Sequence, residues 1–177
     1  MTKYALFLGC TIPARQQNYE LSARKTLAKL GIELVDLANF TCCCPPPIQS
    51  IDLETSIAVA AYNICLAEEA DLNIVTLCSG CFESLKMANV MLKTDEELRT
   101  RINKILSKAG KEFAGNKEVK HFLQVLMEDV GLERLKRNIS KPLSHLKVAP
   151  FYGCHALRPS ELLELDDPER PRILENL

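Results

Sequence analysis

Short apolar runs alternate with amphipathic stretches along the amino-terminal half of the chain. The runs have the length and the aromatic or β-branched content of buried strands, and they cover residues 4–10, 32–37 and 73–78. Between them, residues 17–30 and 52–70 carry apolar side chains at helical spacing. This alternation predicts an α/β fold, with a parallel sheet, flanking helices and right-handed crossovers.

Beyond Cys81 the strand pattern stops, and glycines and helix-capping residues punctuate the chain instead. Helical periodicity predicts helices over residues 82–92, 95–109, 117–130 and 132–138. We therefore expect a helical insertion over residues 82–138. Residues 147–154 then return to the apolar and aromatic character of a strand.

Three consecutive cysteines, Cys42 to Cys44, are followed directly by three prolines, Pro45 to Pro47. Proline removes backbone donors and fixes φ, so we expect residues 42–47 to form a stiff, non-helical loop. A stiff loop suits side chains that must be held in place as ligands.

Composition places the chain among ordinary globular domains. Its 177 residues are 47% hydrophobic and 25% charged, with a formal net charge of −1. Lys and Arg are scattered among Asp and Glu, which argues against the basic face of a nucleic-acid-binding protein. The apolar runs are far shorter than the ~20 residues that cross a bilayer, and the amino terminus lacks the layout of a signal peptide. We expect a cytoplasmic protein without a transmembrane segment.

Eight cysteines without a signal peptide indicate a reducing compartment, where thiolates remain available for metals or redox chemistry. Five of them follow the ends of the predicted strands: Cys10, Cys42, Cys43, Cys78 and Cys81. The carboxyl ends of parallel strands meet at one edge of a sheet, and ligands bind there. Thiols that converge in this way predict a metal cluster.

The competing interpretation is a structural zinc site with spare buried cysteines. Iron–sulfur clusters are usually held by thiolates on loops, whereas a fifth or sixth thiolate exceeds what a tetrahedral zinc site needs. The C…CC…CxxC arrangement therefore favours a cluster over zinc. Cys65 lies within a predicted helix on its apolar face, and we expect it to be a core residue.

Three motifs match a known family. They are Phe7-Leu-Gly-Cys10-Thr-Ile-Pro13, the pair Cys42-Cys43, and Thr76-Leu-Cys78-Ser-Gly-Cys81. These motifs resemble the CCG domain, in particular the first of two such domains in the B subunit of heterodisulfide reductase. Gly153-Cys154-His155 repeats the form of Gly9-Cys10 and resembles the start of the second domain. The resemblance thus implies a first CCG domain over residues 1–138 and the start of an incomplete second one over residues 139–177.

In the CCG family, each complete cysteine set binds a non-cubane 4Fe–4S cluster through five cysteines. By that resemblance, the ligands of one cluster here are Cys10, Cys42, Cys43, Cys78 and Cys81. Cys154 is then the first ligand of a second cluster, which only a further segment or chain can complete. The family usually has proline where Cys44 stands, so the ligating pair is either Cys42-Cys43 or Cys43-Cys44, and the spacing from residues 31–36 favours the former.

The resemblance implies a disulfide oxidoreductase that reduces the heterodisulfide of coenzyme M and coenzyme B to two thiols, as in methanogenesis. This small-molecule disulfide is cleaved between the two clusters. We expect activity only in a complex, with electrons from iron–sulfur and flavin subunits, because the sequence has no dinucleotide or flavin fingerprint. The alternative is a non-catalytic electron-transfer module of another redox complex. Residues 157–161 resemble the reductase more closely.

The histidines carry separate expectations. His155 is either a strand-end histidine with a local hydrogen bond or the catalytic proton donor to a leaving thiolate. His121 falls on a predicted helix and His145 in a predicted loop, so we expect both to be solvated.

Overall fold

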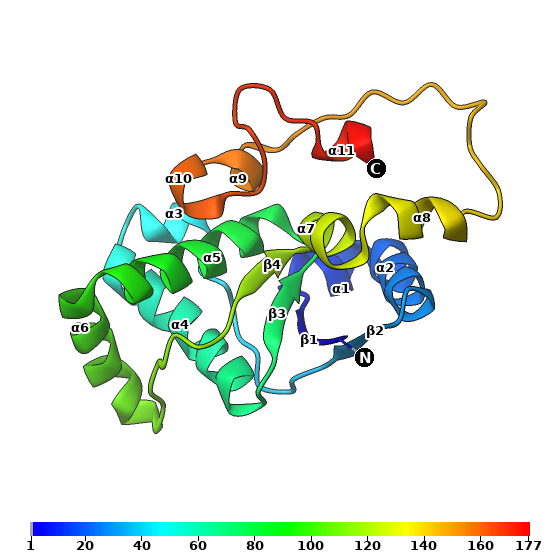
Figure 1. Cartoon of the computed structure of the whole chain (residues 1–177). Coiled ribbons are helices and arrows are strands. Elements are labelled where there is room, and N and C mark those ends of the chain that lie inside the picture. The colour runs from blue at the N-terminus through cyan, green and yellow to red at the C-terminus, as the bar shows by residue number, and fades with distance from the viewer. Residues whose placement is uncertain (1) are drawn as a thin grey trace.

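The computed structural model describes residues 2–177 (Figure 1). Within these residues, four parallel strands form one sheet in the order β2-β1-β3-β4. The strands are β1 (Thr2–Phe7), β2 (Ile32–Val35), β3 (Asn73–Thr76) and β4 (Val119–His121). The predicted class, α/β with a parallel sheet and flanking helices, is confirmed.

Helices cover both faces of the sheet (Figure 1). The longer helices are α2 (Gln17–Lys29), α4 (Leu53–Glu69), α5 (Ser79–Thr94) and α6 (Glu96–Leu106). The shorter helices are α1 (Thr11–Arg15), α3 (Pro46–Gln49), α7 (Phe122–Gln124), α8 (Leu132–Asn138), α9 (Cys154–Leu157), α10 (Ser160–Leu163) and α11 (Ile173–Asn176). A 3₁₀ turn (Ser107–Ala109) extends α6, and a π-helical turn (Val125–Val130) extends α7.

Alternate residues of the strands face two separate cores, because successive side chains of a strand point to opposite faces of the sheet. Ala5 and Phe7 of β1 pack with Ile74 of β3 in the core that also contains the buried faces of α4 and α5. Tyr4 and Leu6 of β1 pack on the other face, against α2 and the helical turns after β4. Burial on both faces explains why the strands read as continuous apolar runs.

Helix boundaries follow local signals in the sequence. Asp52 precedes α4 and its carboxylate accepts a hydrogen bond from the backbone N–H of Thr55 at 2.9 Å. Asp95 caps α6 in the same way through Leu98, also at 2.9 Å. Gly31 ends α2 with φ +76°, the left-handed conformation that its position after the predicted helix indicates.

One segment predicted to be helical contributes a strand. The pattern predicts a helix over residues 117–130, but Val119–His121 forms β4 and only residues 122–130 are helical. The Ile74 N–H donates to the Glu118 carbonyl at 2.8 Å, and Val119 is buried against β3. Pairing with the open edge of the sheet outweighs the helical periodicity, so the insertion over residues 82–138 is not helical throughout.

Two further expectations are wrong. Residues 147–151 form no strand, and Cys154 begins α9 instead. Val148 and Phe151 are 80% and 91% exposed, because no strand among residues 2–177 lies beside them to pair with. Pro46 and Pro47 lie in α3 rather than in a non-helical loop, because the first turn of a helix needs no backbone donors.

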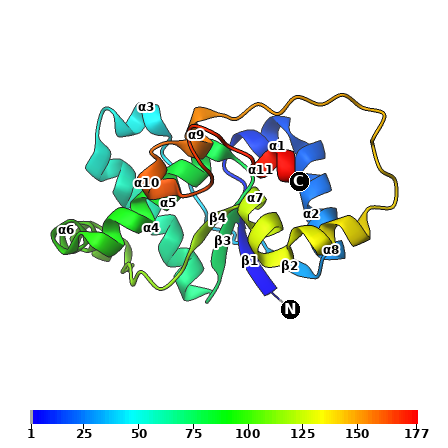
Figure 2. The ribbon, with the colours of Figure 1, turned by 45° about the horizontal axis from the view of Figure 1, so that its top comes forward.

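Residues 139–153 form a connection that leads from α8 to α9, as both views show (Figures 1 and 2). Helices α9 and α10 then pack on α5, and Ala156, Leu157 and Leu163 enter the same core as α4. This packing places the Cys154 segment over the helix that carries Cys81. Among residues 2–177, no helix combines the length and the hydropathy needed to cross a membrane.

The α4 core makes a prediction about stability. Ile64 is completely buried in α4, so Ile64→Ala leaves a cavity and should lower the free energy of unfolding by about 2–5 kcal/mol. Leu21→Ala on α2 is the control, since Leu21 is 53% exposed and its loss should cost less than about 0.5 kcal/mol. Urea unfolding followed by circular dichroism measures both values. Equal losses would contradict the assignment of α4 to the core.

Candidate metal centre

Five cysteines that are far apart in the sequence lie around one cavity of about 180 Å³. The cysteines that line the cavity are Cys10, Cys42, Cys43, Cys78 and Cys81. In the strand order β2-β1-β3-β4, the chain passes from β1 to β2 on one side and then from β2 to β3 on the other side of β1. This change of direction makes the boundary between β1 and β3 a topological switch point. Open α/β sheets bind ligands at such points. The cavity lies at this point, beyond the carboxyl ends of the two strands.

Gly9 makes room for the cysteine sulfurs. It has φ +66°, a conformation that L side chains rarely adopt, and it immediately precedes Cys10. A Cβ atom on Gly9 would lie only 2.6 Å from the Cys81 Sγ. Any side chain at position 9 would therefore displace the sulfur, which explains the glycine in the Phe-Leu-Gly-Cys motif.

Asn63 holds the loop that carries Cys42. Its Oδ1 accepts hydrogen bonds from the backbone N–H of Thr41 at 2.7 Å and from the Thr41 hydroxyl at 3.2 Å. Its Nδ2 donates to the Cys42 carbonyl at 3.0 Å. Asn63 is completely buried on α4, so these bonds are shielded from competing water. The sequence reasoning missed this residue, although a polar side chain within the apolar stripe of a helix is a usable signal.

Cys44 lies behind the cavity and does not line it. Its backbone has φ +53°, and its carbonyl accepts hydrogen bonds from Gln49 Nε2 at 3.2 Å and from Ser84 Oγ at 3.1 Å. Burial raises the pKa of the Cys44 thiol. Cys42 and Cys43 therefore face the cavity as a pair, and Cys44 forms part of the loop that supports them.

The thiols at the cavity are electrostatically coupled. Hydrogen bonding with the Cys81 thiol, aided by the N–H groups of Gly80 and Cys81 at the start of α5, lowers the pKa of Cys78 to about 5 despite its burial. The Cys81 thiol also lowers the pKa of Cys43, and the pKa of Cys81 itself is raised because its proton is shared with both neighbours. Cys78 is thus a thiolate near neutral pH, and the thiolate is the form that binds metals.

The donor set and the space fit a small polynuclear group better than a single ion. A cavity of about 150 Å³ holds a benzene molecule, and the cysteine cavity is about 180 Å³. Within residues 2–177, no three His, Cys, Asp or Glu side chains are grouped closely enough to hold one metal ion. Five cysteines around one cavity exceed the four ligands of a tetrahedral zinc site, and this number favours a cluster over zinc.

Cys65 lies in the core, as its position on the apolar face of a predicted helix indicates. Its side chain is 1% exposed on α4, and burial raises its pKa to about 12. It does not line the cysteine cavity.

Cys154 and His155 lie on α9, and neither lines the cavity. Both are exposed, and His155 Nδ1 is 2.5 Å from Oε2 of Glu83, although the pair is not aligned as a hydrogen bond. Glu83 lies two residues after Cys81 and is largely buried, and desolvation raises its pKa. His155 is close enough to Cys78 for its charge to lower the pKa of that thiol. Sequence reasoning missed Glu83, because nothing local indicates that α9 packs over α5.

His121 is not solvated, contrary to expectation. It ends β4 with 4% exposure, and its Nδ1 accepts a hydrogen bond from the Leu123 N–H at 3.3 Å as the cap of α7. Its ring packs edge-on against Phe82, with centroids 5.6 Å apart. Burial lowers the pKa of His121 to about 4, so it is neutral near pH 7. His145 is exposed in the connection, as predicted.

The sequence of this chain is similar to that of known proteins. Residues 4–86 match the family model CCG, described as a cysteine-rich domain. The chain is 39% identical over 178 residues to the B subunit of a ferredoxin:CoB-CoM heterodisulfide reductase of Methanosarcina mazei. It is 40% identical over 181 residues to a protein of Archaeoglobus profundus that is named as similar to the same subunit. The chain resembles the B subunit of heterodisulfide reductase.

The alignments with these two relatives cover 100% of this chain, and 59% and 60% of the relatives. This chain therefore spans less than two thirds of the length of the curated relatives that it matches.

Two other relatives extend the comparison. The "8-methylmenaquinol:fumarate reductase membrane anchor subunit" of Wolinella succinogenes is 34% identical to this chain over 175 residues, covering 99% of the chain and 60% of the relative. A crystal structure of a hypothetical protein from Helicobacter pylori matches with a TM-score of 0.64 at 20% identity, over 72% of this chain and 25% of the other. That structural match supports the fold alone.

The Asn63 hydrogen bonds make a prediction about the cysteine loop. Asn63→Ala leaves the partly buried Thr41 N–H and Cys42 carbonyl without these partners, and the free energy of unfolding should fall by about 1–3 kcal/mol. Amide hydrogen exchange at Thr41 should accelerate as well. Asn39→Ala, at an exposed position in the same loop, should leave both measurements unchanged. Unaltered exchange at Thr41 in the Asn63 variant would contradict this role.

The shifted pKa of Cys78 makes a prediction about pH. A thiolate, not a thiol, reacts with iodoacetamide. With a pKa of about 5, Cys78 of the iron-free protein should be alkylated at a rate that falls below about pH 5 and is nearly constant from pH 6 to 8. Peptide mass spectrometry measures each site separately. Cys65, with a pKa of about 12, should stay unreactive over that range. A Cys78 rate that still rises steeply between pH 7 and 9 would contradict the shift.

Proposed function

We propose that Cys10, Cys42, Cys43, Cys78 and Cys81 hold one iron–sulfur cluster of the non-cubane 4Fe–4S type. The observation that carries this proposal is the arrangement of these five cysteines around one cavity at the β1–β3 switch point. The lowered pKa values of Cys43 and Cys78 support it, as does the space that Gly9 leaves beside Cys81. Iron–sulfur clusters are bound by cysteine thiolates on loops of this kind.

We propose further that the chain acts within the B subunit of a heterodisulfide reductase. Full coverage of the chain by relatives with that name supports the assignment. Its reaction is the reduction of the heterodisulfide of coenzyme M and coenzyme B, which takes up two electrons and two protons and yields two thiols. The electron donors are iron–sulfur and flavin subunits of a cytoplasmic complex. The bound cluster supplies one-electron redox chemistry, which zinc lacks.

Residues of the chain itself admit the substrate, donate a proton and begin a second cluster site. Cys10 and Cys42 are exposed, so the cavity opens toward solvent and toward a small-molecule disulfide. His155 is the proton donor to a leaving thiolate: it is exposed, it lies near Cys78, and Glu83 restrains its Nδ1, which leaves Nε2 for proton transfer. Cys154 is the first ligand of a second cluster, and residues 139–177 begin the second CCG domain, whose other cysteines come from a further segment or chain.

A second candidate function is electron transfer without catalysis, in a redox complex that acts on another substrate. The Wolinella succinogenes relative, named as a subunit of a fumarate reductase, favours this alternative. Two measurements separate the candidates: iron content tests the cluster, and disulfide reduction tests catalysis.

The ligand assignment predicts the effect of single substitutions. Cys78→Ser should lower the iron bound per chain and alter the electron paramagnetic resonance spectrum of anaerobically purified protein, because a ligand at the cavity is lost. Cys65→Ser is the matched control, a buried cysteine away from the cavity, and should keep its iron. Full iron retention in Cys78→Ser would falsify the assignment.

The two-site model predicts that the 177-residue chain alone reduces the heterodisulfide poorly. Only one complete cysteine set lies in the chain, so the substrate sulfurs would meet one cluster instead of two. A viologen-coupled assay under anaerobic conditions, run with and without a segment that carries a second CC and CxxC set, measures the difference. If the chain alone turns over as fast as the completed protein, cleavage between two clusters is wrong for this protein.

A further inference from the structure

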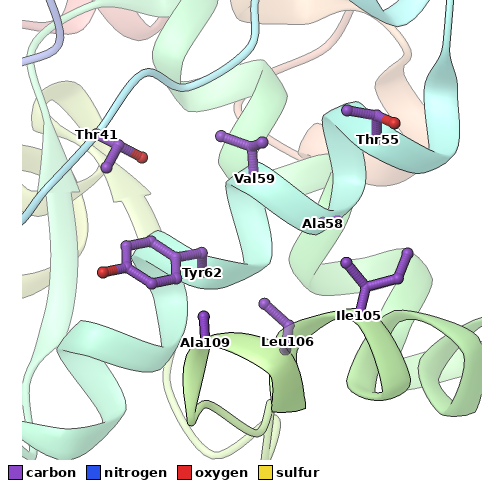
Figure 3. Close-up of a pocket in the computed structure, with 8 residues that line it drawn as sticks. All are labelled: Thr41, Thr55, Ala58, Val59, Tyr62, Ile105, Leu106 and Ala109. Carbon is purple, nitrogen blue, oxygen red and sulfur yellow. The ribbon is translucent and has the colours of Figure 1, made fainter.

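A second cavity, of about 470 Å³, lies between α4 and α6 (Figure 3). Its lining comes from both helices, from the turn after α6 and from the loop before Cys42: Thr41, Thr55, Ala58, Val59, Tyr62, Ile105, Leu106 and Ala109. None of these residues lines the cysteine cavity, so the α4–α6 groove is a separate feature. Its volume falls within the range of about 300–1,000 Å³ that is typical of ligand sites.

The lining offers alkyl and aromatic surface rather than hydrogen-bond partners. Figure 3 shows Val59 and Tyr62 of α4 on one side, and Leu106 and Ala109 on the other. The hydroxyl of Thr41 already donates to Asn63 Oδ1 at 3.2 Å. The hydroxyl of Thr55 donates to the Asp52 carboxylate at 2.6 Å. The occupant that this surface favours is therefore a hydrocarbon chain.

Cationic side chains gather along the α6 side of the groove. Lys104 and Lys108 are exposed, and each immediately precedes a lining residue, Ile105 or Ala109. Consecutive helical residues are about 100° apart around the axis, which places these lysines beside the lining stripe. Lys104 is in the last turn of α6, and Lys108 lies in the 3₁₀ turn that continues it, so the two lysines follow one another at one edge of the groove.

Ion pairs join the two walls toward either end of the groove. Arg101 Nε lies 3.7 Å from Glu54 Oε1 at the start of α4, and Lys111 Nζ lies 2.6 Å from Glu69 Oε2 at its end. These pairs limit the length of an occupant. They also place a carboxylate toward each end of the groove, which disfavours docking on a broad anionic surface. One anionic group beside Lys104 and Lys108 is the complementary partner.

We propose that the α4–α6 groove binds a soluble single-chain amphiphile with an anionic head group. The hydrocarbon chain lies against Val59 and Leu106, and the head group lies beside Lys104 and Lys108. The occupant contacts Thr41, whose hydroxyl and N–H are bound by Asn63, the residue that also holds Cys42. The groove therefore adjoins the loop of the metal centre, but the proposal does not depend on the cluster or on disulfide reduction.

Isothermal titration calorimetry with decanoate on the purified full chain tests the proposal. We expect saturable binding at one site per chain. Ala109→Trp fills the groove at an exposed position and should weaken binding at least tenfold, whereas Ala28→Trp, an exposed alanine on α2, should leave it unchanged. Circular dichroism confirms that both variants fold, and a misfolded Ala109→Trp is replaced by Ala109→Leu, for which a smaller loss in the same direction is expected.

The head group is tested separately from the chain. Lys108→Glu should weaken decanoate binding severalfold, while Lys25→Glu on α2 should not, and decyltrimethylammonium should bind the unaltered protein at least tenfold more weakly than decanoate. Absence of saturable decanoate binding would overturn the proposal, as would equal affinity in the Ala109→Trp and Ala28→Trp variants. Equal affinity for decyltrimethylammonium would overturn the anionic head group.

A membrane arm distinguishes a soluble amphiphile from a lipid surface. Flotation with phosphatidylglycerol vesicles should leave the protein unbound. If the unaltered protein floats with the vesicles and Ala109→Trp abolishes this binding, the proposal is overturned in favour of a bilayer surface.

Discussion

The metal centre depends on the pairing of β1 with β3. These strands are adjacent and parallel although more than sixty residues separate them, with Phe7 opposite Thr76 at their carboxyl ends. The next residues of each strand are therefore brought to one place: Gly9 and Cys10 from the first, Cys78 and Cys81 from the second. The distance of 2.6 Å between a Cβ on Gly9 and the Cys81 sulfur shows how closely the two ends approach. Position 9 therefore has to be glycine because the pairing of β1 with β3 brings it so close to the Cys81 sulfur.

Cys42 and Cys43 are held at the same cavity by side-chain hydrogen bonds to their loop. Strand β2 ends at Val35, well before Cys42, so the sheet alone does not position the cysteine pair. Asn63 accepts from the Thr41 N–H and donates to the Cys42 carbonyl, and Gln49 and Ser84 donate to the carbonyl of Cys44. Side chains of α3, α4 and α5 thus replace the backbone pairing that the loop lacks. A loop held by buried side-chain bonds is sensitive to loss of any one partner, because the others cannot satisfy the freed backbone groups.

The carboxyl-terminal part of the chain contains two packed helices and, before them, an exposed segment without a strand partner. Helices α9 and α10 bury Leu157 and Leu163 against α5, and the Glu83–His155 pair adds a polar link. The preceding residues 147–151 keep the apolar character of a strand but lie exposed. Phe151 lies three residues before Cys154, as Phe7 lies three residues before Cys10, but Phe7 is completely buried whereas Phe151 is 91% exposed. The difference between the two copies is the presence of neighbouring strands, as the proposed second domain would provide.

The sequence by itself determined the elements whose signals are local. The strands after which the cysteines lie, the helices capped by Asp52 and Asp95, the left-handed Gly31 and the buried Cys65 all follow from periodicity, capping chemistry or the demands of a short turn. The C…CC…CxxC spacing, combined with the rule that parallel strands end at one edge, predicted that five cysteines lie around one site.

Only the tertiary structure decided the features that depend on contacts between distant segments. Val119 to His121 became a strand because the edge of β3 was open, and that pairing buried His121, which the helical pattern had left in solvent. Asn63 and Glu83 acquired their partners from loops and helices far along the chain. The groove between α4 and α6 has no signature in either helix alone, because its shape arises from how the two pack. Periodicity records which face of an element is buried, but not which distant residue it meets.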